Sequence, residues 1–135
     1  MRKIFLMSLL LNTICFGQYT VISPYLLDPD KAIGYVDSSA AFWFSAWDET
    51  YGGFYTNIAK NGQVLSSWGT NKDMITQSRN AYGMVRAYML TGKDEYLTKA
   101  REALEFMYNY AWDDNNGGWI NNINNNGSPG SPTEN

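Results

Sequence analysis

The feature that most constrains this fold is an internal repeat with a period of 65 residues. Segment 46–54, Ala-Trp-Asp-Glu-Thr-Tyr-Gly-Gly-Phe, returns as segment 111–119, Ala-Trp-Asp-Asp-Asn-Asn-Gly-Gly-Trp. From 46 to 62, 9 of 17 positions are identical to those 65 residues later, without a gap. A repeat this long indicates one supersecondary unit used more than once, and it exceeds the roughly 33–47 residues of common helical-pair repeats. Two helices plus a structured loop suit the period.

Three helices are predicted, over about 30–46, 72–91 and 94–111. Asp28-Pro29-Asp30 is typical of a helix start, with an acid at the N-cap and proline at the first helical position. The second helix is expected to open at Thr70 or Asn71, and Gly92 is its expected C-terminal cap. Each helix carries apolar residues at three- and four-residue spacings, which favours amphipathic helices.

The same spacing predicts which side chains face inward. The second helix has a stripe of apolar and small residues, which we expect to be buried: Met74, Ile75, Ser78, Tyr82, Val85 and Met89. The expected inward residues of the third helix are Leu97, Ala100, Leu104, Met107 and Ala111. Gln77 lies opposite the stripe, where we expect a contact with a neighbouring helix. Arg79 lies on its flank, so it could reach a cavity or lie along the surface with its stem packed.

A β-hairpin is predicted after the first Gly-Gly pair, from segments 54–58 and 63–67 around Asn61-Gly62. The second copy begins in the same way, but asparagine, glycine, serine and proline then dominate, so we expect neither a second strand nor a following helix there. Because one repeat unit cannot bury its own apolar face, residues 28–135 are expected to be the truncated N-terminal part of a larger domain. A complete small bundle with a frayed tail is the alternative.

The N-terminus predicts export. Residues 1–17 combine two basic residues, an apolar run and a small-residue cleavage site, as in a signal peptide. Residues 18–27 form a short lead before the domain. We therefore expect a secreted or periplasmic protein that does not associate with membranes once the signal is removed. Its net charge of −3 leaves no basic footprint for nucleic acid.

The turn residues leave several interpretations open. Asp48 and Asp113 could form a carboxylate pair of the glycosidase type, but their equivalent places in the repeat favour capping of turns. Trp47 and Trp112 are expected to anchor the core. Phe54 and Trp119 could stack on a sugar ring or pack in their hairpins.

Ordered motifs along the chain resemble the N-acylglucosamine 2-epimerase family, which includes cellobiose epimerases and aldose–ketose isomerases. They are Phe42-Trp43, Asp48, Gly52-Gly53-Phe54, Lys72, Gln77-Ser78-Arg79, Tyr88, Thr91-Gly92-Lys93, Tyr96-Leu97, Ala100 and 113–119. The resemblance implies an all-α fold, the opening helical hairpins of an (α/α)6 toroid, with short β-hairpins after the Gly-Gly turns. It also implies that Arg79 binds a substrate oxygen and that no metal or nucleotide cofactor is used.

The resemblance implies the function as well: epimerisation or isomerisation of a mono- or disaccharide. The family's acid and base are histidines of later helices, and this sequence has none, so we expect the chain by itself to be inactive. Arg79 and Trp119 are the candidate substrate-binding residues. A polysaccharide lyase or glycoside hydrolase on the same toroid, or a non-catalytic carbohydrate-binding fragment, are the alternatives. Apolar helix faces at Met74, Ile75, Leu97 and Leu104 are expected to favour self-association.

Overall fold

The structure is a computed structural model that describes residue 20 and residues 22–130. The expected signal peptide lies outside the described residues. The described residues form the four α-helices α1 (Pro24–Leu27), α2 (Pro29–Phe42), α3 (Met74–Thr91) and α4 (Asp94–Ala111). Single turns of 3-10 helix lie between α2 and α3, at Trp43–Ala46 and Ser66–Trp68. The short strands are β1 (Lys72–Asp73), directly before α3, and β2 (Asn122–Ile123), after α4. The predicted all-α class is confirmed.

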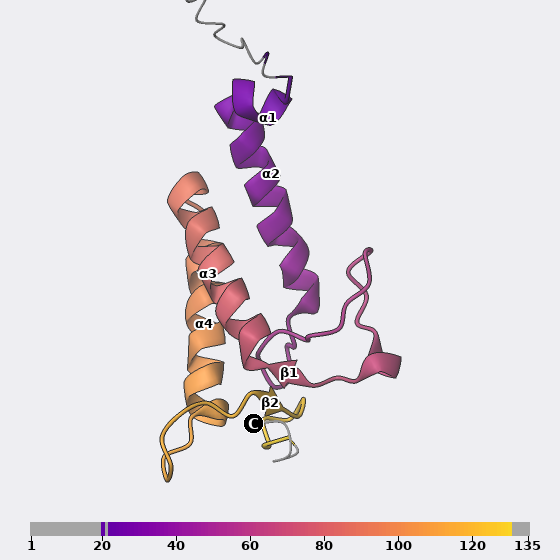
Figure 1. The fold of residues 1–135 in the computed structure, drawn as a ribbon, viewed down its shortest axis with the longest axis vertical. Helices are drawn as coiled ribbons and strands as arrows, with labels where there is room; N and C mark the ends of the chain where they lie inside the picture. Colours follow the sequence, from indigo (N-terminus) through magenta and orange to yellow (C-terminus); the bar gives the residue numbers. More distant parts are fainter. Residues whose placement is uncertain (1–19, 21, 131–135) are drawn as a thin grey trace, which may run out of the picture.

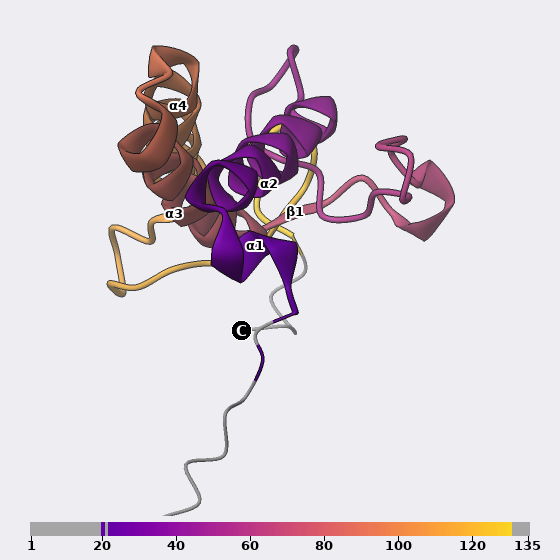
Figure 2. The same cartoon turned by 90° about the horizontal axis from the view of Figure 1, so that it is seen from above.

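The helices α2, α3 and α4 form the body of the molecule. The connection from α2 to α3 and the segment after α4 lie at one end of it, and the turn from α3 to α4 lies at the other (Figure 1). α3 and α4 make an antiparallel hairpin, closed by Gly92 in the left-handed conformation, whose N–H donates to the Tyr88 carbonyl over 2.7 Å. α2 lies beside α3, and the connection from 47 to 71 extends away from α4 (Figures 1 and 2). Both Gly-Gly turns and both strands lie at the end where α3 begins.

The helix starts follow from short acidic side chains. Asp28 accepts a hydrogen bond from the Asp30 N–H over 3.1 Å, as its sequence signature predicts. For α3 the predicted start was wrong. The cap is Asp73, which accepts from the Thr76 N–H over 2.7 Å. Lys72 and Asp73, expected inside the helix, instead form strand β1.

The predicted inward stripe of α3 was largely wrong. Of its six members only Met74 is buried, whereas Tyr82 is 68% exposed and Met89 65% exposed. The buried residues of α3 are Met74, Gln77, Asn80, Ala81, Met84 and Ala87. The rule that large apolar residues face inward failed because alanines hold the contact between helices, where small side chains let backbones approach closely.

The prediction for α4 was correct in part. Ala100, Met107 and Ala111 are buried as expected, but Leu97 and Leu104 are exposed. The buried residues that the spacing missed are Tyr96, Ala103 and Phe106. Together α3 and α4 therefore present an alanine-rich face to the core and leave several of their larger apolar side chains outside.

The sequence repeat is also a repeat of backbone geometry. In the first copy, the Asp48 N–H donates to the Gly53 carbonyl over 3.0 Å, and the equivalent bond from Asp113 to Gly118 is also 3.0 Å. The hairpins match in the same way, with Ala59 donating to Gln63 over 2.8 Å and Asn124 donating to Ser128 over 2.9 Å. In each copy the chain returns through a single antiparallel bridge, Ile58 with Val64 and Ile123 with Pro129. The predicted strands 54–58 and 63–67 are thus reduced to that bridge, and no strand follows β2 in the described residues, as expected.

The second hairpin is held against the start of α3. β2 pairs antiparallel with β1, with Lys72 opposite Ile123, and the Met74 N–H donates to the Asn121 carbonyl over 2.9 Å. Because β2 belongs to the second copy and β1 precedes α3, this small sheet joins the two repeat units. The sequence did not predict this pairing, because Lys72 and Asp73 were expected inside the helix.

Lys72 is the centre of this junction. Its side chain is fully buried, and its ammonium donates to Asp48 Oδ2 over 2.7 Å, to the Gly52 carbonyl over 2.6 Å and to the Asn125 carbonyl over 2.7 Å. An ammonium has three donors, so its bonding is complete. The first turn, β1 and the second hairpin thus meet at one cation.

The junction changes the acid–base properties of its members. Burial lowers the pKa of the Lys72 ammonium, against the opposing effect of Asp48. Burial would raise the pKa of Asp48, but hydrogen bonds from Lys72, Tyr55 and two backbone amides outweigh it and hold that pKa below its usual range. Burial and the hydrogen bond to Asp48 raise the pKa of Tyr55 to about 12.

We predict that Lys72→Met destabilises the chain by roughly 3–5 kcal/mol, because removing one partner of a buried ion pair leaves the other charge uncompensated. Urea unfolding followed by circular dichroism measures the change. The control is Lys93→Met, which removes the ion pair between Lys93 and Asp37 (2.8 Å) at the partly exposed end of the hairpin. Equal losses of unfolding free energy in the two variants would show that the Lys72–Asp48 pair contributes no more than a surface ion pair.

Asp48 should make the unfolding free energy of the chain depend on pH in the acidic range. Its pKa is lowered in the folded chain, so between that pKa and the unfolded value near 3.9 the unfolded state binds more protons and stability falls as pH falls. The difference in unfolding free energy between the wild type and Asp48→Asn should therefore have its full size above about pH 4 and become smaller as the pH falls below that value. A difference that stays constant from pH 7 to pH 2.5 would contradict this prediction.

Candidate functional site

Arg79 lies in an open groove between α2 and α3. The groove has a volume of about 450 Å³, which is within the range of small-molecule sites. Tyr35 and Ser39 line it from α2, Trp43 lines it from the 3-10 turn that follows α2, and Arg79 and Tyr82 line it from α3. Of the two positions that the sequence left open for Arg79, the structure supports the one facing a cavity.

Gln77 sets the direction in which Arg79 points. The Phe54 N–H donates to its side-chain oxygen over 2.7 Å, and its amide nitrogen donates to the Phe54 carbonyl over 2.7 Å. Gln77 therefore binds the first Gly-Gly turn, and the expected contact with a neighbouring helix was wrong. Because two residues turn a helix by about 200°, burying Gln77 directs Arg79 away from the core.

The groove is positively charged. Its lining residues include two arginines, Arg79 and Arg86, and no carboxylate. Within the described part of the chain neither arginine makes an ion pair or a side-chain hydrogen bond. A guanidinium keeps its charge at any physiological pH and offers five donors, so both side chains are free to bind ligand oxygens.

Trp119, the second candidate, lies elsewhere. It is 50% exposed and packs edge-on against Trp112 with ring centroids 5.1 Å apart, and it is not among the residues that line the Arg79 groove. Its first-copy equivalent Phe54 is fully buried against Trp47, so Phe54 packs in its hairpin and cannot stack on a sugar. Trp47 packs against the core as expected, whereas Trp112 is 38% exposed and the expectation that it anchors the core was wrong.

The two aspartates of the repeat cap turns, as their equivalent positions favour. Asp48 Oδ1 accepts from the Thr50 and Tyr51 N–H groups over 2.9 and 3.3 Å. Asp113 Oδ1 accepts from the Asn115 and Asn116 N–H groups over 2.9 and 3.1 Å.

Hydrogen bonds from the Asn116 side chain and from these amides lower the pKa of Asp113. Hydrogen bonds thus lower the pKa of both carboxyl groups, mainly from Lys72 and Tyr55 for Asp48 and from its own turn for Asp113, and a general acid needs the opposite shift. Across residues 22–130, no three His, Cys, Asp or Glu side chains are grouped so as to hold a metal ion.

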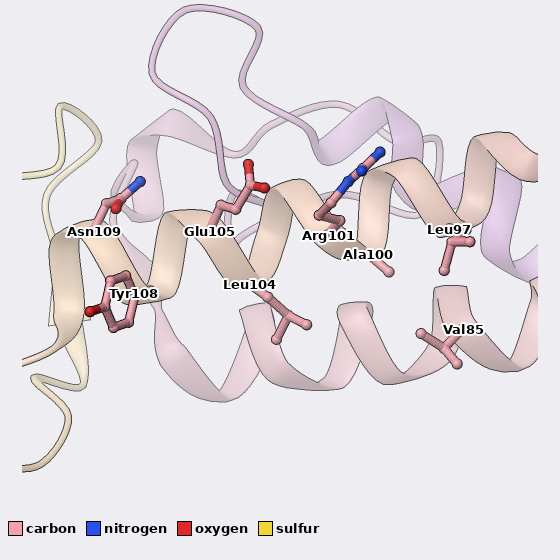
Figure 3. Close-up of a pocket in the computed structure, with 8 residues that line it drawn as sticks. All are labelled: Val85, Leu97, Ala100, Arg101, Leu104, Glu105, Tyr108 and Asn109. Atoms are coloured by element: carbon pink, nitrogen blue, oxygen red, sulfur yellow. The ribbon is translucent and has the colours of Figure 1, made fainter.

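A second groove, of about 360 Å³, lies between α3 and α4 (Figure 3). Seven residues of α4 line it. Five of them, at positions 100, 101, 104, 105 and 108, are the 65-residue equivalents of positions 35, 36, 39, 40 and 43, with which α2 and the 3-10 turn after it line the Arg79 groove. The face of α2 that holds α3 thus recurs on α4, where no described helix covers it.

The apolar floor of this second groove is formed by Val85, Leu97, Ala100 and Leu104, and Arg101 and Glu105 lie at its rim (Figure 3). Opposite charges one turn apart balance each other, so this groove lacks the uncompensated charge of the first. None of the described helices is both long enough and apolar enough to cross a bilayer.

Comparison with known proteins identifies one matching family. The family model described as N-acylglucosamine 2-epimerase matches residues 41–135. No protein with a curated description matches significantly.

Several solved structures share the fold. A D-mannose isomerase is 23% identical with a TM-score of 0.59, and the match covers 67% of this chain and 22% of that one. A cellobiose 2-epimerase from Spirochaeta thermophila is 22% identical with a TM-score of 0.58, covering 80% of this chain and 28% of that one. A cellobiose 2-epimerase from Bacillus thermoamylovorans is 22% identical with a TM-score of 0.62, covering 75% and 27%.

The chain thus spans about a quarter of the length of these solved structures. The family model matches well over half of the chain, and the structural matches agree with it in fold. The chain therefore belongs to the N-acylglucosamine 2-epimerase family.

Proposed function

We propose that this chain is the N-terminal, substrate-binding part of an exported sugar 2-epimerase or aldose–ketose isomerase. The observation that carries the proposal is Arg79, an unpaired arginine in a groove whose other wall is aromatic. In this proposal the guanidinium binds the oxygen of the sugar carbonyl, where negative charge develops as the neighbouring carbon loses its proton. The names of the solved structures that share the fold support a mono- or disaccharide as substrate.

The proton transfer itself requires residues that these 135 do not supply. A general acid or base works best with a pKa near the working pH. An arginine cannot be deprotonated near neutral pH, and the sequence has no histidine. The raised pKa of Tyr55, about 12, makes that phenol a worse acid than a free one. We therefore propose that this chain binds sugar without converting it.

A titration of the chain with cellobiose, followed by two-dimensional NMR of the backbone amides, tests both candidate residues. We predict chemical-shift changes at groove residues. The dissociation constant obtained from them should rise about tenfold or more in Arg79→Gln, because a hydrogen bond to a charged group contributes roughly 1.5–3 kcal/mol. Trp119→Ala should remove shifts at the second turn. Arg101→Gln, in the other groove, is the control and should bind as the wild type does.

In the same samples, prepared in deuterated buffer, cellobiose, mannose and N-acetylglucosamine should gain no deuterium at carbon 2. Deuterium that appears with the wild type and disappears with Arg79→Gln would refute the binding-only proposal and give the chain an active site. Unchanged amide spectra at saturating sugar would refute the substrate contact at Arg79.

We further propose that the protein is exported and cleaved before Gln18, and that the apolar groove of Figure 3 promotes self-association. N-terminal sequencing of protein recovered after export should begin at Gln18, and recovery with Met1–Gly17 attached would contradict cleavage. Sedimentation velocity should show association that Leu104→Ser reduces, because Leu104 is an exposed apolar side chain of that groove. Ile22→Ser, at an exposed position far from the groove in sequence, is the matched control.

A further inference from the structure

We propose that the Arg79 groove binds an acidic disaccharide, and that Arg86 selects it by holding a carboxylate on the sugar unit distant from the carbonyl. The inference rests on the proposed function of Arg79 as the residue at the carbonyl end. It assigns Arg86 a role in specificity and the substrate the class of uronic-acid-containing sugars.

The spacing of the two arginines fits a ligand longer than one ring. Arg79 and Arg86 are seven residues apart on α3, so they share a face of the helix and are separated by a rise of about 10 Å. Both line the same groove, with Tyr82 between them in sequence and mostly exposed. A ligand that touches both guanidinium groups must extend along α3.

The charge of the groove fits an anion. No aspartate or glutamate lines it, and within the described residues no carboxylate pairs with Arg86. This is notable in a chain with 13 acidic and 10 basic residues, because exposed arginines in such a chain have many acids available as partners. The planar fork of a guanidinium matches a carboxylate with two parallel hydrogen bonds. A neutral sugar hydroxyl would use only part of that capacity.

The opposite wall fits the uncharged part of a sugar. Tyr35 of α2 and Trp43 of the following 3-10 turn present aromatic surface to the groove, and Ser39 between them in sequence adds a hydroxyl. Aromatic rings pack on the apolar faces of pyranose rings, while the arginines meet the oxygens. The groove between α3 and α4 lacks this arrangement, since its one arginine, Arg101, shares the rim with Glu105.

Two disaccharides that differ at one carbon test the inference. Cellobiouronic acid, glucuronic acid linked β-1,4 to glucose, carries a carboxylate where cellobiose has a hydroxymethyl group. Dissociation constants of both are measured by NMR titration of the full chain at low ionic strength, in the wild type and in Arg86→Gln. Arg101→Gln serves as the control for loss of one positive charge elsewhere.

The wild type should bind cellobiouronic acid about tenfold or more tightly than cellobiose, as expected for one charge-assisted interaction. Arg86→Gln should remove this preference, whereas Arg101→Gln should keep it. Equal binding of the two disaccharides by the wild type, or a preference that survives in Arg86→Gln, would overturn the inference while leaving the role of Arg79 intact.

Two further results are informative. If neither disaccharide binds, the proposed function and the inference both fail. If sodium acetate at the same concentration shifts the same amides as strongly as cellobiouronic acid does, the groove is a general anion site and the sugar assignment is wrong. Unchanged unfolding midpoints in urea show that the variants are folded, which is expected because Arg86 is exposed and unpaired.

Discussion

The buried ammonium of Lys72 is the interaction on which the rest of this structure depends. It binds the carboxylate and a carbonyl of the first Gly-Gly turn and a carbonyl of the second hairpin. A charge without solvent is tolerated only when every donor is used, so the three segments must hold one arrangement around it. α3 starts two residues later, and its first turn is thereby placed against both repeat units.

The rotation of α3 follows from the same end of the molecule. Gln77 takes both backbone hydrogen bonds of Phe54, and Gly53 of that turn lies so close to Phe106 of α4 that an added Cβ would be 3.0 Å from its ring. The turn is thus clamped between α3 and α4. With Gln77 inward, Arg79 and Arg86 are left on the α2 side of the helix, which is where the candidate site forms.

The repeat explains why the Arg79 groove and the groove between α3 and α4 differ in character. Equivalent faces of the chain line them, but the first offers Tyr35, Ser39 and Trp43 where α4 offers Ala100, Leu104 and Tyr108. The equivalent of the clamped Gly53 is Gly118, which has no atom near its Cβ position. The first unit is therefore closed by its neighbour and carries a polar, cationic groove, while the second presents an open apolar one.

The sequence alone determined the helices, the repeat and the family, because caps, Gly-Gly turns and spacing are local signals that survive in any context. It also singled out Arg79 as a candidate substrate-binding residue, although only through the resemblance, since the helical wheel left that side chain on a flank. Tertiary structure decided the rest. Alanine contacts set the buried face of α3 against the apparent apolar stripe, and long-range hydrogen bonds to Lys72 and Gln77 set its rotation. Such bonds join residues 20 or more positions apart, so no local pattern in the sequence predicts them. Only when these bonds orient α3 do Arg79 and Arg86 line one groove.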